Sequence, residues 1–258
     1  MLQIDQYAHI SPLKHIHPVE KVSFSGLFLL FSILTKDIWV TSFTFIVMSV
    51  IIVAGGRIHI LHYLKLLTIP SLFLLTSLVT ILFSIAPEEK LPVETLWSTN
   101  FFSWNLYISR FSFHQTLQLA ATVLSSVSCL YFFILTTPLH QFMWVLQKVK
   151  LPKLIIELIG FTYQFIFVLL ATMQEIYVAQ ASRLGYQHFK GSIGALAQLV
   201  ANLFIKSLTT AKELQIAIDS RGGDEYLYDV DIHQSYRTLH IAGIGISAIL
   251  LTLLTVCL

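Results

Sequence analysis

Two short stretches late in the chain share a pattern of small residues, an arginine and a glycine. They read Ala179-x-x-Ser182-Arg183-x-Gly185 and Ala217-x-x-Ser220-Arg221-x-Gly223. An arginine offers five N–H donors in a planar fork, which suits a carboxylate or carbonyl groups on a partner. Small side chains beside it let a helix end approach a groove closely. The chemistry indicated is recognition of a partner rather than catalysis.

Each copy also has a simpler interpretation as a helix C-terminus. Glycine takes the left-handed conformation that ends many helices, and a basic residue favours the negative end of the helix dipole. Gly222 directly follows Arg221, so the second copy offers a choice of cap. Two copies with the same spacing favour a shared role. Two such ends could each engage one member of a dimer, whose conformational change would then move both helices.

The composition of the chain is that of a membrane protein. Of the 258 residues, 55% are hydrophobic and 12% are charged, whereas soluble domains carry about 25% charged residues. The net charge of +2 is too small to indicate a nucleic-acid partner. The N-terminus lacks the basic-then-apolar layout of a signal peptide, and we expect it to be cytoplasmic. Cys129 and Cys257 predict neither a disulfide framework nor a metal site.

We predict an all-α, polytopic membrane protein with about five transmembrane helices and long cytoplasmic helices. The predicted spans are 22–34, 38–54, 66–86, 113–136 and 238–258. A tight turn at 35–37 separates the first two, because Lys36 and Asp37 would be costly inside the bilayer. Residues 87–112 form a predicted loop, with aromatic residues that suit a membrane interface: Trp97, Trp104 and Tyr107.

Residues 138–237 form a predicted cytoplasmic region between the spans of 1–137 and 238–258. Within it, 154–171 is apolar enough to cross a membrane, but Glu157 and Gln164 interrupt it. We favour a helix that begins at the bilayer surface and continues into water. Residues 192–221 are amphipathic and too charged to span, so this helix is expected on or under the membrane.

Charge predicts the orientation of the chain. With the N-terminus, 55–65 and 138–237 on one side, that side holds 13 of the 16 basic residues. The other side holds Lys36, Lys90 and Arg110. Basic residues concentrate in cytoplasmic loops, so the larger group is predicted to be cytoplasmic.

The chain resembles the transmembrane T component of energy-coupling factor (ECF) importers, in the cobalt/nickel branch of CbiQ-like proteins. The resemblance covers nearly the whole chain and includes Ile4-Asp5-x-Tyr7-Ala8 and His17-Pro18-x-Glu20-Lys21 before the first span. Both arginine motifs occupy the family's coupling positions. The family pattern is usually Ala-Arg-Gly. Here the copies read Ser182-Arg183-Leu184 and Ser220-Arg221-Gly222, so the first copy departs further.

The resemblance implies a non-catalytic coupling subunit of a prokaryotic plasma membrane. Such subunits bridge two cytoplasmic ATP-binding-cassette ATPases and a membrane substrate-binding (S) component, and ATP-driven movement of their coupling helices delivers the ion. The residues expected to contact the ATPases are Ala179, Ser182, Arg183, Gly185, Ala217, Ser220, Arg221 and Gly222. Those expected to contact the S component are Ile193, Leu196, Val200 and Leu203.

Other functions have weaker support. The pairs His15-x-His17 and His59-x-x-His62 lack further ligands nearby, so we predict no metal site and no cofactor in this chain. An intramembrane enzyme would need a nucleophile–base pair or a set of metal ligands within the spans, and the predicted spans contain neither. A conventional ABC permease, or a T component serving vitamin-binding S components, remains an alternative. The sequence leaves cobalt and nickel both open.

Overall fold

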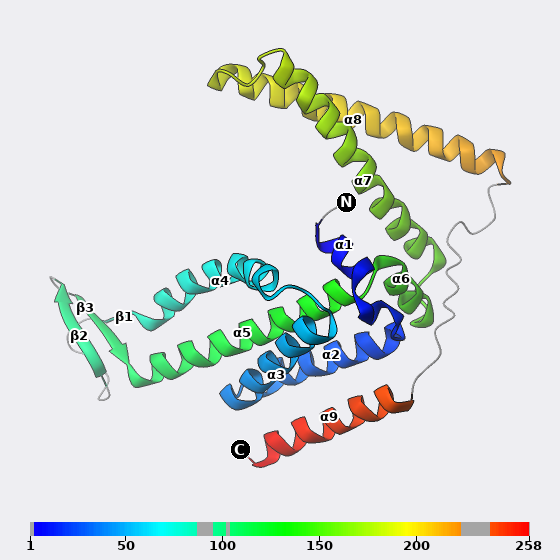
Figure 1. The fold of residues 1–258 in the computed structure, drawn as a ribbon. Helices are drawn as coiled ribbons and strands as arrows, with labels where there is room; N and C mark the ends of the chain where they lie inside the picture. The colour runs from blue at the N-terminus through cyan, green and yellow to red at the C-terminus, as the bar shows by residue number, and fades with distance from the viewer. Residues whose placement is uncertain (1–2, 87–94, 102–103, 223–237, 258) are drawn as a thin grey trace. The chain divides into compact units, whose positions relative to one another are not determined.

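The computed structural model describes residues 3–86, 95–101, 104–222 and 238–257 (Figure 1). These residues are mostly helical, which confirms the predicted all-α class. The chain divides into two compact units. One unit comprises Leu2–Phe142 with His233–Leu258, and the other comprises Met143–Ile232.

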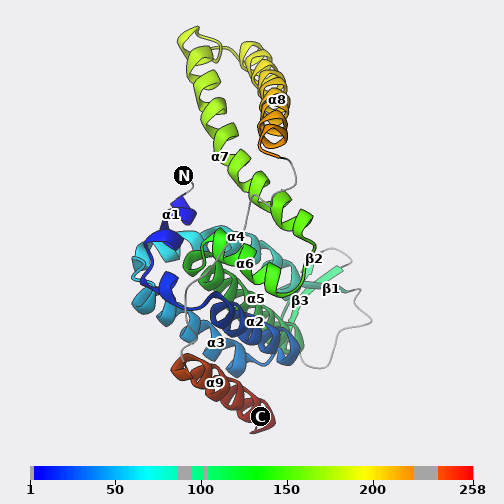
Figure 2. The ribbon, with the colours of Figure 1, turned by 90° about the vertical axis from the view of Figure 1, so that its right-hand side faces the viewer.

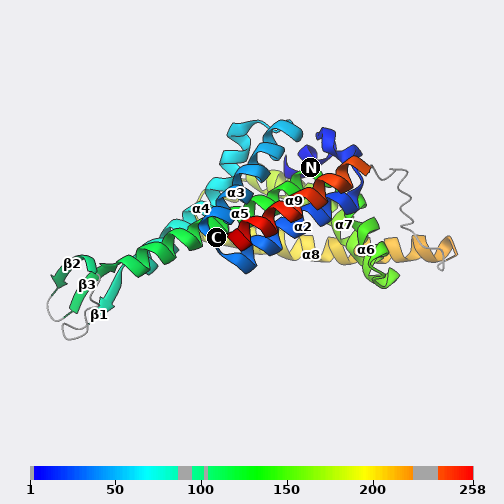
Figure 3. The same ribbon diagram turned by 90° about the horizontal axis from the view of Figure 1, so that it is seen from below.

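The larger unit is a bundle of apolar helices with a short amphipathic N-terminal region. Its helical elements are α1 (Gln3–Ile10), the 3-10 helix η1 (Pro12–His15), α2 (Pro18–Thr35), α3 (Ile38–Val50), the π-helix η2 (Ile51–Gly55), α4 (Ile60–Leu82), α5 (Arg110–Thr136) and α9 (Thr238–Cys257). Helix α5 packs against α2, α3 and α4, while α9 packs mainly against α2 (Figure 3). Helix α6 (Leu139–Lys148) follows α5 at the sequence boundary between the units.

Helices α2 and α3 begin and end where the sequence offers the appropriate caps. Pro18 is the first residue of α2, where its missing N–H costs no hydrogen bond. His17 caps this end, its Nδ1 accepting the N–H of Val19 at 3.3 Å. Lys36 ends α2 in the left-handed conformation, with φ of 53°, and Asp37 is the N-cap of α3. The turn expected at 35–37 therefore separates two helices.

Hydroxyl groups connect the helices inside the bundle. The Ser32 and Ser125 hydroxyls lie 3.0 Å apart and join α2 to α5. The Tyr63 hydroxyl of α4 lies 2.9 Å from the Ser49 hydroxyl and 3.0 Å from that of Ser128. Such bonds between helices stabilise membrane bundles, where apolar side chains gain little by leaving lipid. Around them lies an apolar core whose members include Phe28, Val40, Met48, Ile52, Leu135 and Leu251.

The segment predicted as a loop at 87–112 contains regular structure instead. Strands β1 (Ser84–Ala86), β2 (Thr95–Phe101) and β3 (Trp104–Ser109) form an antiparallel sheet in the order β1-β3-β2. Trp104 pairs with Phe101 and Tyr107 with Ser98, so aromatic residues expected in a loop lie on strands. Aromatic and β-branched residues favour strands, which explains this correction. Helix α5 also begins at Arg110 rather than at residue 113. Ser109 is its N-cap.

The smaller unit consists mainly of two long helices, α7 (Lys153–Ser182) and α8 (Phe189–Ser220). A turn at 183–188 connects them, and the helices meet beside this turn and then diverge (Figures 1 and 2). The buried residues of α8, Ala195 and Leu199, both belong to its first part. The remainder of α8 therefore extends beyond its contact with α7.

By length and composition, six helices in the described part of the chain are able to cross a membrane. They are Pro18–Thr35, Ile38–Gly55, Ile60–Leu82, Arg110–Thr136, Lys153–Ser182 and Phe189–Ser220. Within α9 the apolar stretch Ala242–Leu253 is shorter than these candidate spans. Helix α8 meets the criterion although its charges favoured a position outside the bilayer. The structure thus has the features of a multi-pass membrane protein.

Candidate functional site

Both arginine motifs form the C-terminal ends of long helices. Helix α7 ends at Ser182 and α8 at Ser220, so Arg183 and Arg221 occupy the same capping position. Their backbones are nearly identical, with φ and ψ of −92° and 15° at Arg183 and −98° and 9° at Arg221. Both arginine side chains are exposed. The two copies are therefore alike in local structure as well as in sequence.

The residue after each arginine turns the chain out of the helix. Leu184 has φ of 60° and Gly222 has φ of 105°, both in the left-handed region. The Leu184 N–H donates to the Ala181 carbonyl at 3.0 Å, and the Gly222 N–H donates to the Asp219 carbonyl at 3.2 Å. Glycine adopts this conformation freely, whereas a leucine is strained by about 1–2 kcal/mol. The departure of the first copy from the family pattern thus places strain beside Arg183.

Gly185 has a different role from the one expected of a capping glycine. Its φ is not in the left-handed region, but a Cβ atom added there would lie 3.1 Å from the Gln180 carbonyl oxygen. The same Cβ would lie 3.5 Å from the Cβ of Ala195 in α8. Gly185 therefore permits close packing of the turn against α8. Its counterpart in the second copy, Gly223, lies outside the described residues.

The alanine and serine of each motif add little side-chain volume at the helix end. The Ser182 hydroxyl donates to the Val178 carbonyl at 2.9 Å, and the Ser220 hydroxyl donates to the Ala217 carbonyl at 2.9 Å. Both hydroxyls are thus bonded back to their own helices. Ala179 and Ala217 are exposed on the preceding turn. At each end the arginine is therefore a long, charged side chain next to the small alanine and serine of its motif.

The two motifs do not form a single site. They lie at opposite ends of α8 (Figure 1), a helix of 32 residues. At 1.5 Å per residue, this helix is about 48 Å long. Two binding points at that separation suit two partner surfaces, and they could not act on one small ligand together.

A shallow apolar hollow lies on the exposed side of α8. It is lined by Ile193, Leu196, Ala197, Val200, Ala201 and Phe204. Three of the residues expected to contact a partner in the membrane, Ile193, Leu196 and Val200, are exposed here, whereas Leu203 is half-buried. Sequence reasoning missed Ala197, Ala201 and Phe204. The spacing Ala197-x-x-x-Ala201 was an available signal, since small residues four apart let membrane helices pack closely.

Three of the described histidines take part in two separate aromatic contacts. His9 stacks on His140 with 5.9 Å between ring centroids, and His62 lies 4.4 Å from the Tyr7 ring. Within the residues that the structure describes, no group of three His, Cys, Asp or Glu side chains is placed to hold a metal ion. The fold defines the class: a polytopic membrane protein, in which two similar helix ends with exposed arginines lie far apart.

Comparison with known proteins identifies the family. The cobalt transport protein family CbiQ matches residues 9–230. The cobalt transport protein CbiQ of Salmonella typhimurium is 27% identical over 177 residues, which cover 69% of this chain and 75% of that protein. An uncharacterized protein of Methanocaldococcus jannaschii is 26% identical over 255 residues, covering 98% of this chain and 93% of that protein.

A putative fused cobalt transport protein CbiMQ of Methanocorpusculum labreanum is 30% identical over 225 residues. The match covers 84% of this chain but 36% of the fused protein. The chain belongs to the CbiQ family of cobalt transport proteins. It is accordingly a membrane component of cobalt transport, and the resemblance drawn from its sequence is confirmed.

Proposed function

We propose that this chain is the non-catalytic coupling subunit, the T component, of an ECF-type importer of cobalt or nickel ions. In this proposal it connects two cytoplasmic ATPase subunits to a membrane substrate-binding component. The observation that carries the proposal is the pair of equivalent arginine ends on α7 and α8, about 48 Å apart at 1.5 Å per residue of α8. Paired ATPases offer two equivalent surfaces, and paired helix ends match them.

Each arginine end is proposed to enter a groove on one ATPase subunit. Arg183 and Arg221 would donate to carboxylate or carbonyl oxygens there, while the alanine and serine of each motif permit close approach. Gly185 and Gly222 complete the two turns. The orientation proposed from the basic residues places both ends in the cytoplasm, where the ATPases are expected. Nucleotide-driven movement of the ATPase pair would then move α7 and α8.

The apolar hollow on α8 is proposed to contact the substrate-binding component. Ile193, Leu196 and Val200 are exposed there beside Ala197 and Ala201, a surface that another apolar helix could approach closely. The fused relative supports this proposal, because its name joins CbiM and CbiQ in one chain. A cobalt transport protein fused to a CbiQ-like chain in one organism is expected to associate with it as a separate subunit in another.

The proposal is tested with Arg183→Ala, Arg221→Ala and the double variant. Co-purification of the ATPase subunits with the chain and uptake of radioactive cobalt would both be measured. Loss of a desolvated, hydrogen-bonded arginine costs about 2–5 kcal/mol, so each single variant should lose most of the bound ATPase. Lys206→Ala is the matched control, because Lys206 is an exposed cation of α8 outside both motifs. Normal uptake by the double variant would refute the proposal.

The alternatives are separated by measuring cobalt uptake with the membrane substrate-binding component omitted or exchanged. Uptake by this chain and the ATPases alone, without a further membrane protein, would indicate a conventional ABC permease. Substitution of vitamin-binding components for the metal-binding component, with uptake retained, would indicate a T component of broader use.

A further inference from the structure

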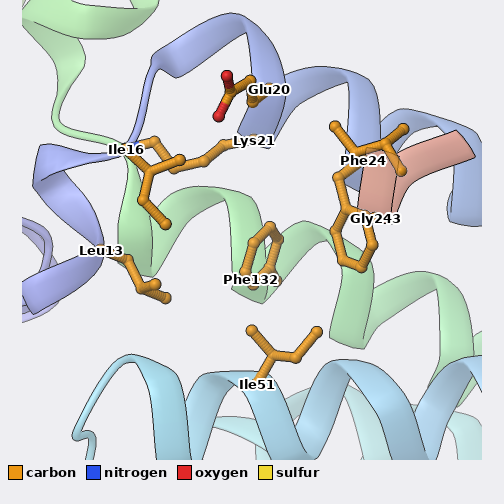
Figure 4. A pocket seen from close by; sticks show the side chains of 9 residues that line it. Leu13, Ile16, Glu20, Lys21, Phe24, Ile51, Phe132 and Gly243 are labelled. Carbon is orange, nitrogen blue, oxygen red and sulfur yellow. The ribbon is translucent and has the colours of Figure 1, made fainter. Parts of the chain in front are cut away.

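A cavity of about 360 Å³ lies inside the larger unit, next to the start of α2. Its walls come from η1, α2, η2, α5 and α9 (Figure 4). The lining residues are Leu13, Ile16, Glu20, Lys21, Phe24, Ile51, Phe132, Gly243 and Ile244. Most of them are apolar, so the cavity suits a hydrocarbon rather than an ion.

The polar residues of the cavity lie at one edge. Figure 4 shows the Glu20 carboxylate at one edge of the group and Ile51 at the opposite edge, with Phe132 between them. Glu20 and Lys21 belong to the first turn of α2, where this candidate span begins. That end of a span lies near the polar headgroups of a bilayer. The cavity is therefore polar at the end near the headgroups and apolar elsewhere, which matches the polarity of a lipid molecule.

Helix α9 forms one wall of the cavity, through Gly243 and Ile244. Gly243 contributes no side chain, and a Cβ atom added there would meet no other atom within 4 Å. Ile246, Ile249 and Leu253 of the same helix are exposed, as expected for residues that face lipid. Hydrocarbon chains are thus the molecules present at this wall in a membrane.

We propose that the cavity binds one hydrocarbon chain of a bilayer lipid, with the lipid's polar end beside Glu20. The volume supports a chain, since an apolar cavity of about 150 Å³ holds one benzene, and this one has more than twice that space. An empty void would deprive Phe24, Phe132 and Ile51 of contact atoms on one side. The bound chain supplies those contacts and fills the space between α9 and α5.

Two glycines of α9 provide a matched pair of test variants. Gly243→Leu places a branched side chain in the space proposed for the lipid, whereas Gly245→Leu adds the same side chain outside the cavity lining. Neither added Cβ atom has a neighbour within 4 Å, so both variants are expected to fold. Both gain the same helix propensity, which leaves occupation of the cavity as their difference.

The full chain would be delipidated in detergent, incubated with palmitoyl-oleoyl phosphatidylethanolamine, and examined by native mass spectrometry. Wild type and Gly245→Leu should each retain one lipid in excess of detergent adducts. Each displaced methylene weakens binding roughly fourfold, so the four carbons of the leucine side chain should lower the affinity of Gly243→Leu on the order of a hundredfold. Retention of one lipid by Gly243→Leu at the wild-type level would overturn the proposal, as would binding of detergent alone. This outcome is independent of ATPase binding by the arginine ends.

Discussion

The ammonium group of Lys21 lies 2.9 Å from the carbonyl oxygen of Thr136, the last residue of α5. It also donates to Gln141 Oε1 at 2.8 Å, and the Gln141 amide donates to the Lys14 carbonyl at 2.8 Å. Lys21 is only 3% exposed. A buried cation at a helix C-terminus offsets the negative end of the helix dipole and satisfies a carbonyl that the helix leaves unpaired. Lys21 thereby connects the start of α2 to the end of α5.

Replacement of Lys21 by methionine should destabilise the helix bundle. The methionine side chain is unbranched and one heavy atom shorter, and it removes the donor, leaving the Thr136 carbonyl and the Gln141 amide oxygen buried without it. Each unsatisfied buried group costs about 1–3 kcal/mol. A lower Tm in detergent, followed by fluorescence-detected size exclusion, would show this loss. Lys65→Met, at an exposed lysine of α4, is the control and should leave Tm nearly unchanged.

Leu184→Gly should stabilise the α7–α8 turn while weakening its recognition of a partner. Glycine relieves the left-handed strain of about 1 kcal/mol at this position, so the Tm should rise. The leucine side chain is 64% exposed beside Arg183, and we expect it to add apolar contact with the ATPase. ATPase binding measured by pull-down should therefore fall although the chain is more stable.

The second motif provides the reciprocal variant. Gly222→Leu introduces a side chain at φ of 105°, a backbone conformation that L residues rarely adopt and that is occupied by glycine here. It should lower the free energy of unfolding by about 1–2 kcal/mol.

For the first motif, a rise in ATPase binding by Leu184→Gly would contradict the expected apolar contact.

The hydroxyl of Tyr63 should contribute measurably to packing of α4. Tyr63→Phe removes its bonds to the Ser49 and Ser128 hydroxyls, at 2.9 and 3.0 Å, and keeps the ring. Hydrogen bonds between membrane helices contribute about 0.6 kcal/mol on average, so the expected loss is about 1 kcal/mol. Urea or SDS unfolding of the chain would measure it. A double-mutant cycle with Ser128→Ala should show coupling between the two positions, and additive effects would argue against a direct bond.

Gly56→Ala should be far more harmful than Gly26→Ala. A Cβ atom at residue 56 would lie 2.6 Å from the Ile52 carbonyl oxygen, which belongs to the π-helix backbone and must shift. At residue 26 within α2, the added Cβ has no neighbour within 4 Å. Alanine is favoured over glycine by about 1 kcal/mol inside helices, so Gly26→Ala should raise Tm. Expression level and Tm of the two variants would be compared, and equal values would contradict the predicted clash.

Local features of the sequence predicted much of the fold. The turn at Lys36-Asp37 and the helix ends at Arg183 and Arg221 follow from charge, capping and apolar periodicity over a few residues. The sheet was missed because Trp97, Trp104 and Tyr107 suited a membrane interface as well as strands, and because β1 pairs with β3 over a longer separation, as in Ser84 with Tyr107. Such pairing is not visible in a single segment. The left-handed Leu184 was unpredictable for the opposite reason, since local preference places glycine there and the fold overrides it.

Helix α8 lies between the two arginine turns and fixes the distance that separates them. A single continuous helix of 32 residues separates the two arginine turns, and each inserted residue would lengthen it by about 1.5 Å and rotate one end by roughly 100°. The number of residues in α8 therefore sets the distance between the two surfaces of any partner that binds both arginine turns. Insertions in this helix would be tolerated by the fold yet change both the spacing and the facing direction of the arginines. We expect exposed residues of α8 outside its apolar hollow and its C-terminal motif to accept substitutions more readily than α8 accepts changes in length.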